Sequence, residues 1–138
     1  MALFDIGMRT VSQRLPKVVS PKTHAIIDYA SVGMFAVMGA LVWKRHKRAA
    51  ISSWFCGAQQ LTLALLTDFP GGVAKVVSYD THLKIDAGFA GIVGVAPNLT
   101  GFSDEWPSVF FRVHGMAIAA ETGMSAPEPE DWRTRRAA

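Results

Sequence analysis

The sequence that decides the fold is KVVSPKTHAIIDYASVG at residues 17–33, because it returns as KVVSYDTHLKIDAGFAG at residues 75–91. Nine of the seventeen positions are identical, including a threonine–histidine pair and an isoleucine–aspartate pair. The offset of 58 residues also holds further along the chain without a gap, since Gly57 maps onto Gly115. A fixed offset of this kind indicates one structural unit that is present twice.

Long segments without charge accompany both copies. Three segments contain no Lys, Arg, Asp or Glu. They are residues 29–43, 49–67 and 87–103, which are fifteen, nineteen and seventeen residues long, respectively. A helix needs about 20 mainly apolar residues to cross a bilayer, and extension through Asp28 and Asp86 brings the first and third segments to that length. A weaker fourth segment, 108–125, contains Arg112, His114 and Glu121. Each copy therefore predicts two spanning helices, and a soluble helical bundle is the alternative.

The composition agrees with a membrane protein. Of the 138 residues, 50% are hydrophobic and only 18% are charged, with a net charge of +3. This balance excludes a disordered chain, and a single cysteine excludes a disulfide framework. We predict an all-α fold, an integral membrane four-helix bundle built from two repeated helical hairpins. Its parts are an N-terminal amphipathic helix at 1–16, hairpins at 17–74 and 75–126, and a polar C-terminal tail at 127–138.

The number of spans and the flanking charges predict the topology. Two spans in each copy give both copies the same orientation, with a pseudo-twofold axis along the membrane normal. Nine Lys and Arg residues lie on the side of the termini and five on the other side. The positive-inside rule then predicts that both termini are cytoplasmic, although the basic turn at 44–48 favours the reverse. The basic residues flank the spans without a recognition motif, so nucleic acid is not expected as a partner.

Several segments resemble small bacterial membrane proteins of the SPW-repeat type. They are VSPKTH at 19–24 followed by IDY at 27–29, LLTDFPG at 65–71, and APNLTGFS at 96–103. The last is similar to the Ser-Pro-Trp-x-x-Gly-Phe-Ser signature of that family, with Asn98 in place of the tryptophan. The resemblance covers residues 19–122 and implies a multi-pass protein of two helix pairs in the bacterial inner (cytoplasmic) membrane. It implies no activity, because none is assigned to proteins of this type.

The repeated His and Asp residues are the candidate ligands. His24 and Asp28 lie four residues apart on one helical face, as do His82 and Asp86, and the repeat predicts both pairs at one depth. Such a group suits a divalent metal ion, with the carboxylates as ligands or as supports for the histidines. The two histidines also suit a haem iron, and a single histidine suits the magnesium of a chlorophyll-type pigment. The alternative, which the sequence favours, is structural: each pair fixes the link before its helix.

Three glycines and two charged residues are candidates for contact with a partner. Gly88, Gly91 and Gly94 form a smooth stripe, which predicts close packing within the bundle or docking of another membrane protein. Arg112 and Glu121 are expected to face the bundle or a partner, because a charge that faces lipid is costly.

The sequence contains no nucleotide-binding loop, nucleophile elbow, zinc motif or pair of catalytic acids, so we do not expect an enzyme. The leading prediction is a non-catalytic accessory or stabilising subunit of a larger respiratory or photosynthetic membrane complex, with lipids and that assembly as its partners. One alternative is an electron-transfer protein that binds haem, pigment or metal through His24 and His82. Another is a small transporter or proton relay that uses Asp28 and Asp86.

Overall fold

A computed structural model describes residues 15–138, and this part of the chain contains five helices and no strand. The helices are α2 (Pro21–Val42), α3 (Lys47–Leu66), α4 (Tyr79–Thr100), α5 (Pro107–Met124) and α6 (Glu130–Ala137). The prediction of an all-helical fold is confirmed. The amphipathic helix predicted at 1–16 lies, except for its last two residues, outside the described residues.

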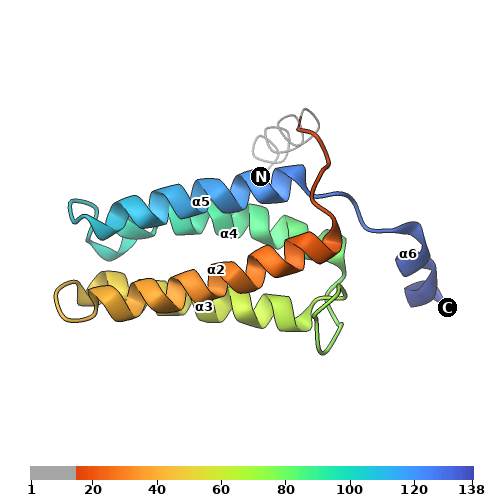
Figure 1. The fold of residues 1–138 in the computed structure, drawn as a ribbon, viewed down its shortest axis with the longest axis horizontal. Coiled ribbons are helices and arrows are strands. Elements are labelled where there is room, and N and C mark those ends of the chain that lie inside the picture. Colours follow the sequence, from red (N-terminus) through yellow and green to blue (C-terminus); the bar gives the residue numbers. More distant parts are fainter. Residues whose placement is uncertain (1–14) are drawn as a thin grey trace.

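The four long helices lie side by side as two antiparallel pairs (Figure 1). Helix α2 packs closely along α3, and α4 packs closely along α5, whereas contacts between the two pairs are fewer. The turn within each pair lies at one end of the molecule (Figure 1). The starts of α2 and α4, the α3–α4 link and α6 lie at the other end, which places the first turns of α2 and α4 at similar depth.

Equivalent serines begin the first helix of each pair. The Ser20 hydroxyl accepts a hydrogen bond from the Thr23 backbone N–H at 3.2 Å, and the Ser78 hydroxyl accepts one from the Thr81 N–H at 3.2 Å. Each bond satisfies a donor that would otherwise have no partner within the helix, which fixes the start of the helix at the same repeat position.

Two apolar clusters lie on either side of the polar residues described below. The larger one centres on the fully buried Phe35, whose ring contacts those of Phe89, Phe110 and Phe111 from the other helix pair. The smaller one lies near the α6 end, and Trp132 packs against it. Its four buried members are Ala25, Ala64, Phe69 and Tyr79.

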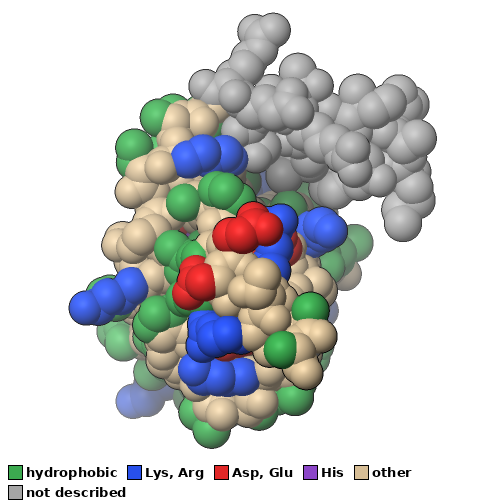
Figure 2. All heavy atoms as spheres, turned by 90° about the vertical axis from the view of Figure 1, so that its right-hand side faces the viewer, with side chains coloured by type: hydrophobic (Ala, Val, Ile, Leu, Met, Phe, Trp, Pro, Cys, Tyr) green, Lys and Arg blue, Asp and Glu red, His purple; other side chains and the backbone are tan. Residues whose placement is uncertain are grey.

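The tail predicted at 127–138 forms α6 and is fastened to the start of α4. Arg133 Nη2 donates to Asp80 Oδ2 at 2.7 Å, and the Tyr79 backbone N–H donates to Glu128 Oε1 at 3.3 Å. Figure 2 views this end of the molecule and shows acidic and basic side chains beside one another there. The charged tail therefore covers the end at which the first helix of each pair begins.

Candidate metal centre

Two histidine–aspartate pairs, one from each repeat, meet in the interior of the molecule. His24 and Asp28 lie on α2, and His82 and Asp86 lie on α4, with about one helical turn between the members of each pair. All four residues are buried, with exposed fractions of 0 or 1%. We call these four residues the His–Asp centre.

The distances within the His–Asp centre are short. The two Nε2 atoms are 3.2 Å apart. His82 Nε2 lies 3.1 Å from Asp28 Oδ2 and 3.0 Å from Asp86 Oδ2. His24 Nε2 lies 3.1 Å from Asp86 Oδ2 and 3.6 Å from Asp28 Oδ2. The structure thus brings together the four residues that the sequence predicted at one depth.

A hydroxyl group holds the outer nitrogen of each imidazole. Nδ1 of His24 lies 2.7 Å from Ser125 Oγ, and Nδ1 of His82 lies 2.8 Å from Thr67 Oγ1. Each hydroxyl donates its hydrogen to the backbone carbonyl four residues earlier. Because a hydroxyl has only one hydrogen to donate, Nδ1 must be the donor in each of these contacts. In a neutral imidazole the lone pair is then on Nε2, which faces the interior of the centre.

With both imidazoles neutral, the His–Asp centre directs two lone pairs and two carboxylate oxygens at one another. Such atoms repel unless protons or a cation lie between them, and burial strengthens the repulsion. Five of the six distances among these atoms range from 3.0 to 3.6 Å, and all four atoms lie within 4.8 Å of one another. Ligands placed tetrahedrally at about 2.0–2.1 Å from a metal ion are about 3.3–3.4 Å apart. The donor set and the Nδ1–H contacts are also those of protein sites for divalent transition metals.

The geometry fits a single ion better than a haem or a pigment. Two imidazoles on opposite faces of one haem iron hold their Nε2 atoms about 4 Å apart, twice a metal–nitrogen bond length, with the porphyrin between them. Here the Nε2 atoms of His24 and His82 are 3.2 Å apart, and both carboxylates lie where the macrocycle would have to pass. A pigment bound through one of these histidines meets the same obstruction.

Glu121 lies beside the His–Asp centre and not at a surface for a partner. Its exposed fraction is 7%, and its Oε1 lies 3.3 Å from His24 Nδ1. The side chain therefore faces the bundle, which is one of the two positions expected for it. Arg112 is exposed near the start of α5, where its Nη2 donates to the Ser103 carbonyl at 3.5 Å.

The predicted glycine stripe leaves open space where its side chains would lie, although the Gly94 backbone lies against Gly115 of α5. A Cβ atom placed on Gly88, Gly91 or Gly94 would meet nothing within 4 Å, so their missing side chains do not serve packing inside the molecule. The close approach of α4 and α5 instead occurs at Gly115, where a Cβ would lie 2.7 Å from the Ala90 carbonyl oxygen. Docking of a partner on the stripe stays a prediction.

Three residues that support the centre were not identified from the sequence. Thr67 and Ser125 are equivalent in the repeat, and that equivalence of two hydroxyl residues is the signal that would have found them. The third is Gln60, whose Nε2 donates to Asp28 Oδ1 at 3.1 Å. Its equivalent is Ile118, so the repeat contains no signal for it.

No protein-family model, curated protein or solved structure matches this chain. The function proposed below therefore depends on the geometry of the His–Asp centre and on the surface of the helices around it.

Proposed function

We propose that this chain is a four-span membrane protein that binds one divalent transition-metal ion in the His–Asp centre, where its two repeats meet. The observation that carries the proposal is the convergence of two Nε2 atoms and two carboxylate oxygens, with both Nδ1 atoms held by hydroxyl groups. An ion in this position would join α2 to α4 and so tie together helix pairs that share few other contacts. Metal binding would then contribute to folding stability.

The donor set limits the class of ion. Imidazole nitrogen is a common ligand of Zn²⁺, Fe²⁺ and Ni²⁺, whereas carboxylate oxygen suits harder ions such as Mn²⁺. A mixed set of two nitrogens and two oxygens favours divalent ions of this group, and the absence of cysteine among the four residues disfavours Cu⁺. Four protein ligands in a closed site are typical of an ion that is held and not of one that binds a substrate water.

The outward-facing side chains support a membrane setting. Helices α2 and α3 are each long and apolar enough to cross a bilayer. Leu41, Phe55, Leu99 and Met116, one from each long helix, are 65–75% exposed, whereas polar side chains of the same helices are buried at His24, Asp28, Gln60, His82, Asp86, His114 and Glu121. This pattern is the reverse of that in soluble proteins and is expected for helices surrounded by lipid, whose ionisable residues face the interior.

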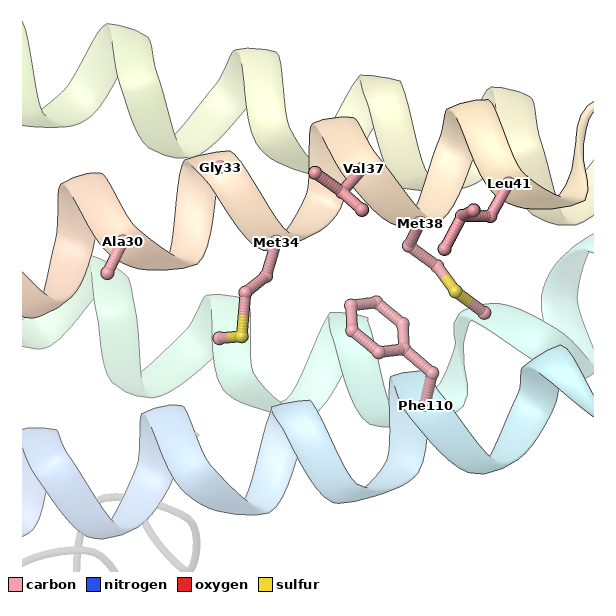
Figure 3. A pocket seen from close by; sticks show the side chains of 7 residues that line it. All are labelled: Ala30, Gly33, Met34, Val37, Met38, Leu41 and Phe110. Atoms are coloured by element: carbon pink, nitrogen blue, oxygen red, sulfur yellow. The ribbon is translucent and has the colours of Figure 1, made fainter.

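A groove between α2 and α5 has the same apolar character. It has a volume of about 440 Å³ and is lined along α2 from Ala30 to Leu41 and on α5 by Phe110 (Figure 3). All seven of its lining residues are apolar. A hydrocarbon tail of a membrane lipid suits this groove better than water does.

The two ends of the helices differ in a way that suggests their sides of the membrane. Trp43, Trp54 and Trp106 are 40–60% exposed and lie toward the end formed by the two turns, as in an interfacial aromatic belt. Of the twelve basic residues within 15–138, seven lie toward the α6 end. The positive-inside rule places the α6 end, and with it the His–Asp centre, toward the cytoplasm.

The other functional predictions have no structural observation of their own. An accessory role in a respiratory or photosynthetic complex is compatible with a bound ion and stays a prediction. Transport or proton relay through Asp28 and Asp86 also stays a prediction, as does the resemblance to SPW-repeat proteins.

Metal titration of the detergent-solubilised protein tests the proposal. We expect one Zn²⁺ or Co²⁺ ion to bind per chain, with affinity measured by competition against a chelator, and expect His24→Ala and His82→Ala to abolish this binding. His46→Ala is the matched control, because His46 lies in the α2–α3 turn and pairs with Glu105. Absence of stoichiometric binding by the wild type, or equal binding by all the variants, would overturn the proposal.

A further inference from the structure

The two halves of the His–Asp centre have different surroundings. The repeat relates His24 to His82, Asp28 to Asp86 and the supporting hydroxyls of Thr67 and Ser125 to each other, but Gln60 and Glu121 have no polar equivalent in the other repeat. At these positions on α3 and α5, a polar residue in one repeat is equivalent to an apolar residue in the other. The apolar residue therefore shows the same position without a supporting hydrogen bond.

A chain of buried hydrogen bonds leads to Asp28. Gln60 Nε2 donates to Asp28 Oδ1 at 3.1 Å, and Ser31 Oγ donates to Gln60 Oε1 at 2.7 Å. Because the Ser31 hydrogen is used in this way, His114 Nε2, 2.6 Å from Ser31 Oγ, must donate to that oxygen. Every donor in the chain thus points toward the carboxylate, and this fixes Asp28 with Oδ2 directed into the His–Asp centre.

The equivalent chain is absent around Asp86. The counterparts of Gln60, Ser31 and His114 are Ile118, Phe89 and Cys56, respectively, none of which carries an amide, hydroxyl or imidazole group. Asp86 Oδ1 is buried and has no hydrogen-bond partner. Asp86 is therefore free to bind an ion through one oxygen or through both, whereas Asp28 has only Oδ2 to offer.

The surroundings of the two histidines also differ, and again the residue on α2 has the additional supporting group. His24 Nδ1 faces both the Ser125 hydroxyl and, at 3.3 Å, the carboxylate of Glu121. The counterpart of Glu121 is Leu63, so the repeat supplies no second acceptor for His82, whose Nδ1 contacts the Thr67 hydroxyl. A carboxylate close to the outer N–H orients a metal-binding imidazole and makes its other nitrogen a better donor.

We propose that the His–Asp centre is built of two unequal halves, in which Gln60 and Glu121 are positioning residues that pre-orient the α2 ligands while the α4 ligands adjust to the ion. This inference rests on the proposed metal-binding function. Pre-orientation raises affinity because less conformational freedom is lost when the ion binds. A free Asp86 oxygen allows the coordination number to increase from four to five on the α4 side.

Variants that replace a supporting residue by its apolar type in the other repeat test this inference. The test variants are Gln60→Leu and Glu121→Leu, and their matched controls are Ile118→Leu and Leu63→Met at the equivalent positions of the other repeat. Co²⁺ is the probe, because its visible absorption reports coordination geometry as well as occupancy. Helical content by circular dichroism identifies the variants that remain folded.

We expect each test variant to weaken Co²⁺ binding by about tenfold to a hundredfold and to change the visible spectrum, while each control changes affinity by less than about twofold. Glu121→Gln should restore most of the affinity lost in Glu121→Leu, since its amide oxygen can take the position of Glu121 Oε1, 3.3 Å from His24 Nδ1. If the wild type binds Co²⁺ but the test variants match the controls, the unequal halves are disproved and the metal site stands. If the wild type binds no metal, the proposed function fails first.

Discussion

At the scale of single residues, a hydroxyl group outside the His–Asp centre determines which nitrogen of each imidazole carries the proton. The hydroxyls of Ser125 and Thr67 each donate their hydrogen to a backbone carbonyl, so they accept hydrogen bonds from His24 and His82, respectively. Without these hydroxyls, each imidazole would be free to rotate or to carry its proton on Nε2. That alternative places a proton where a metal ion would bind.

Removal of either hydroxyl should therefore weaken metal binding. We expect Ser125→Ala and Thr67→Val each to lower Zn²⁺ affinity by about tenfold or more, as measured by chelator competition. Thr62→Val is the control, because the Thr62 hydroxyl also donates to a carbonyl four residues earlier but is exposed. Equal affinities for all three variants would show that the hydroxyls do not orient the ligands.

The sequence alone predicted the four candidate ligands, because the repeat marks His24, Asp28, His82 and Asp86 directly. It did not predict their supports, because Thr67 and Ser125 follow α3 and α5 and each contacts a histidine of the opposite repeat, whereas Gln60 has no polar equivalent. Which helices of the two copies become neighbours depends on packing between the pairs. The inward position of Glu121 likewise depends on the rotation of α5, which a segment with charges at both ends does not reveal.

At the scale of helices, the contact between α4 and α5 depends on one glycine. A Cβ on Gly115 would lie 2.7 Å from the Ala90 carbonyl oxygen and 2.8 Å from the Gly94 backbone nitrogen, both fixed parts of α4. The same atom on Gly91 would meet nothing within 4 Å. The two glycines therefore have different roles, because the close approach of α4 and α5 needs a glycine at Gly115 and not at Gly91.

This difference predicts opposite effects of the same substitution. Gly115→Ala should force α5 away from α4 and lower the free energy of unfolding by about 1–3 kcal/mol. Gly91→Ala should leave it unchanged or raise it by up to about 1 kcal/mol, because alanine is the better helix former. Denaturant unfolding in detergent, followed by circular dichroism, measures both changes. A loss for Gly91→Ala as large as that for Gly115→Ala would contradict the packing described.

The ends of the helices were predicted only in part. Helix α4 continues through Pro97 and Asn98 to Thr100. It ends at Gly101, which has the left-handed φ of 74° and donates its N–H to the Pro97 carbonyl. A proline in the last turn removes few bonds, so its effect on the boundary is small. The docking of α6 was not predicted, because it depends on contacts with the distant residues Asp80 and Tyr79.

At the scale of the whole molecule, each repeat begins beside the end of the other. The Val19 N–H donates to the Met124 carbonyl at 3.1 Å, and the equivalent Val77 N–H donates to the Leu66 carbonyl at 2.9 Å. The carbonyls of Val19 and Val77 in turn accept from equivalent N–H groups, each at 2.8 Å. This arrangement places the His–Asp centre at the junction of the two repeats, close to the end where the chain enters and leaves the helices.

Four membrane-spanning helices in this arrangement would place the α3–α4 link and the α2–α3 turn on opposite sides of the membrane. In a Cys56→Ala background, we expect Val73→Cys in the α3–α4 link to react with a membrane-impermeant thiol reagent only from the cytoplasmic side. Arg45→Cys in the α2–α3 turn should react only from the opposite side, since both residues are exposed and lie at opposite ends of the helices. Reaction of both cysteines from the same side would contradict four spans.

The central claim, a divalent metal ion bound between the repeats, is tested most directly by X-ray absorption at the metal edge of the Zn²⁺-loaded protein. We expect one ion per chain with four nitrogen and oxygen ligands at about 2.0–2.1 Å and with scattering from two imidazole rings. The imidazole signal should be lost in the His24→Ala and His82→Ala variants. An ion surrounded by six water or carboxylate oxygens, or a signal unchanged in those variants, would contradict the account.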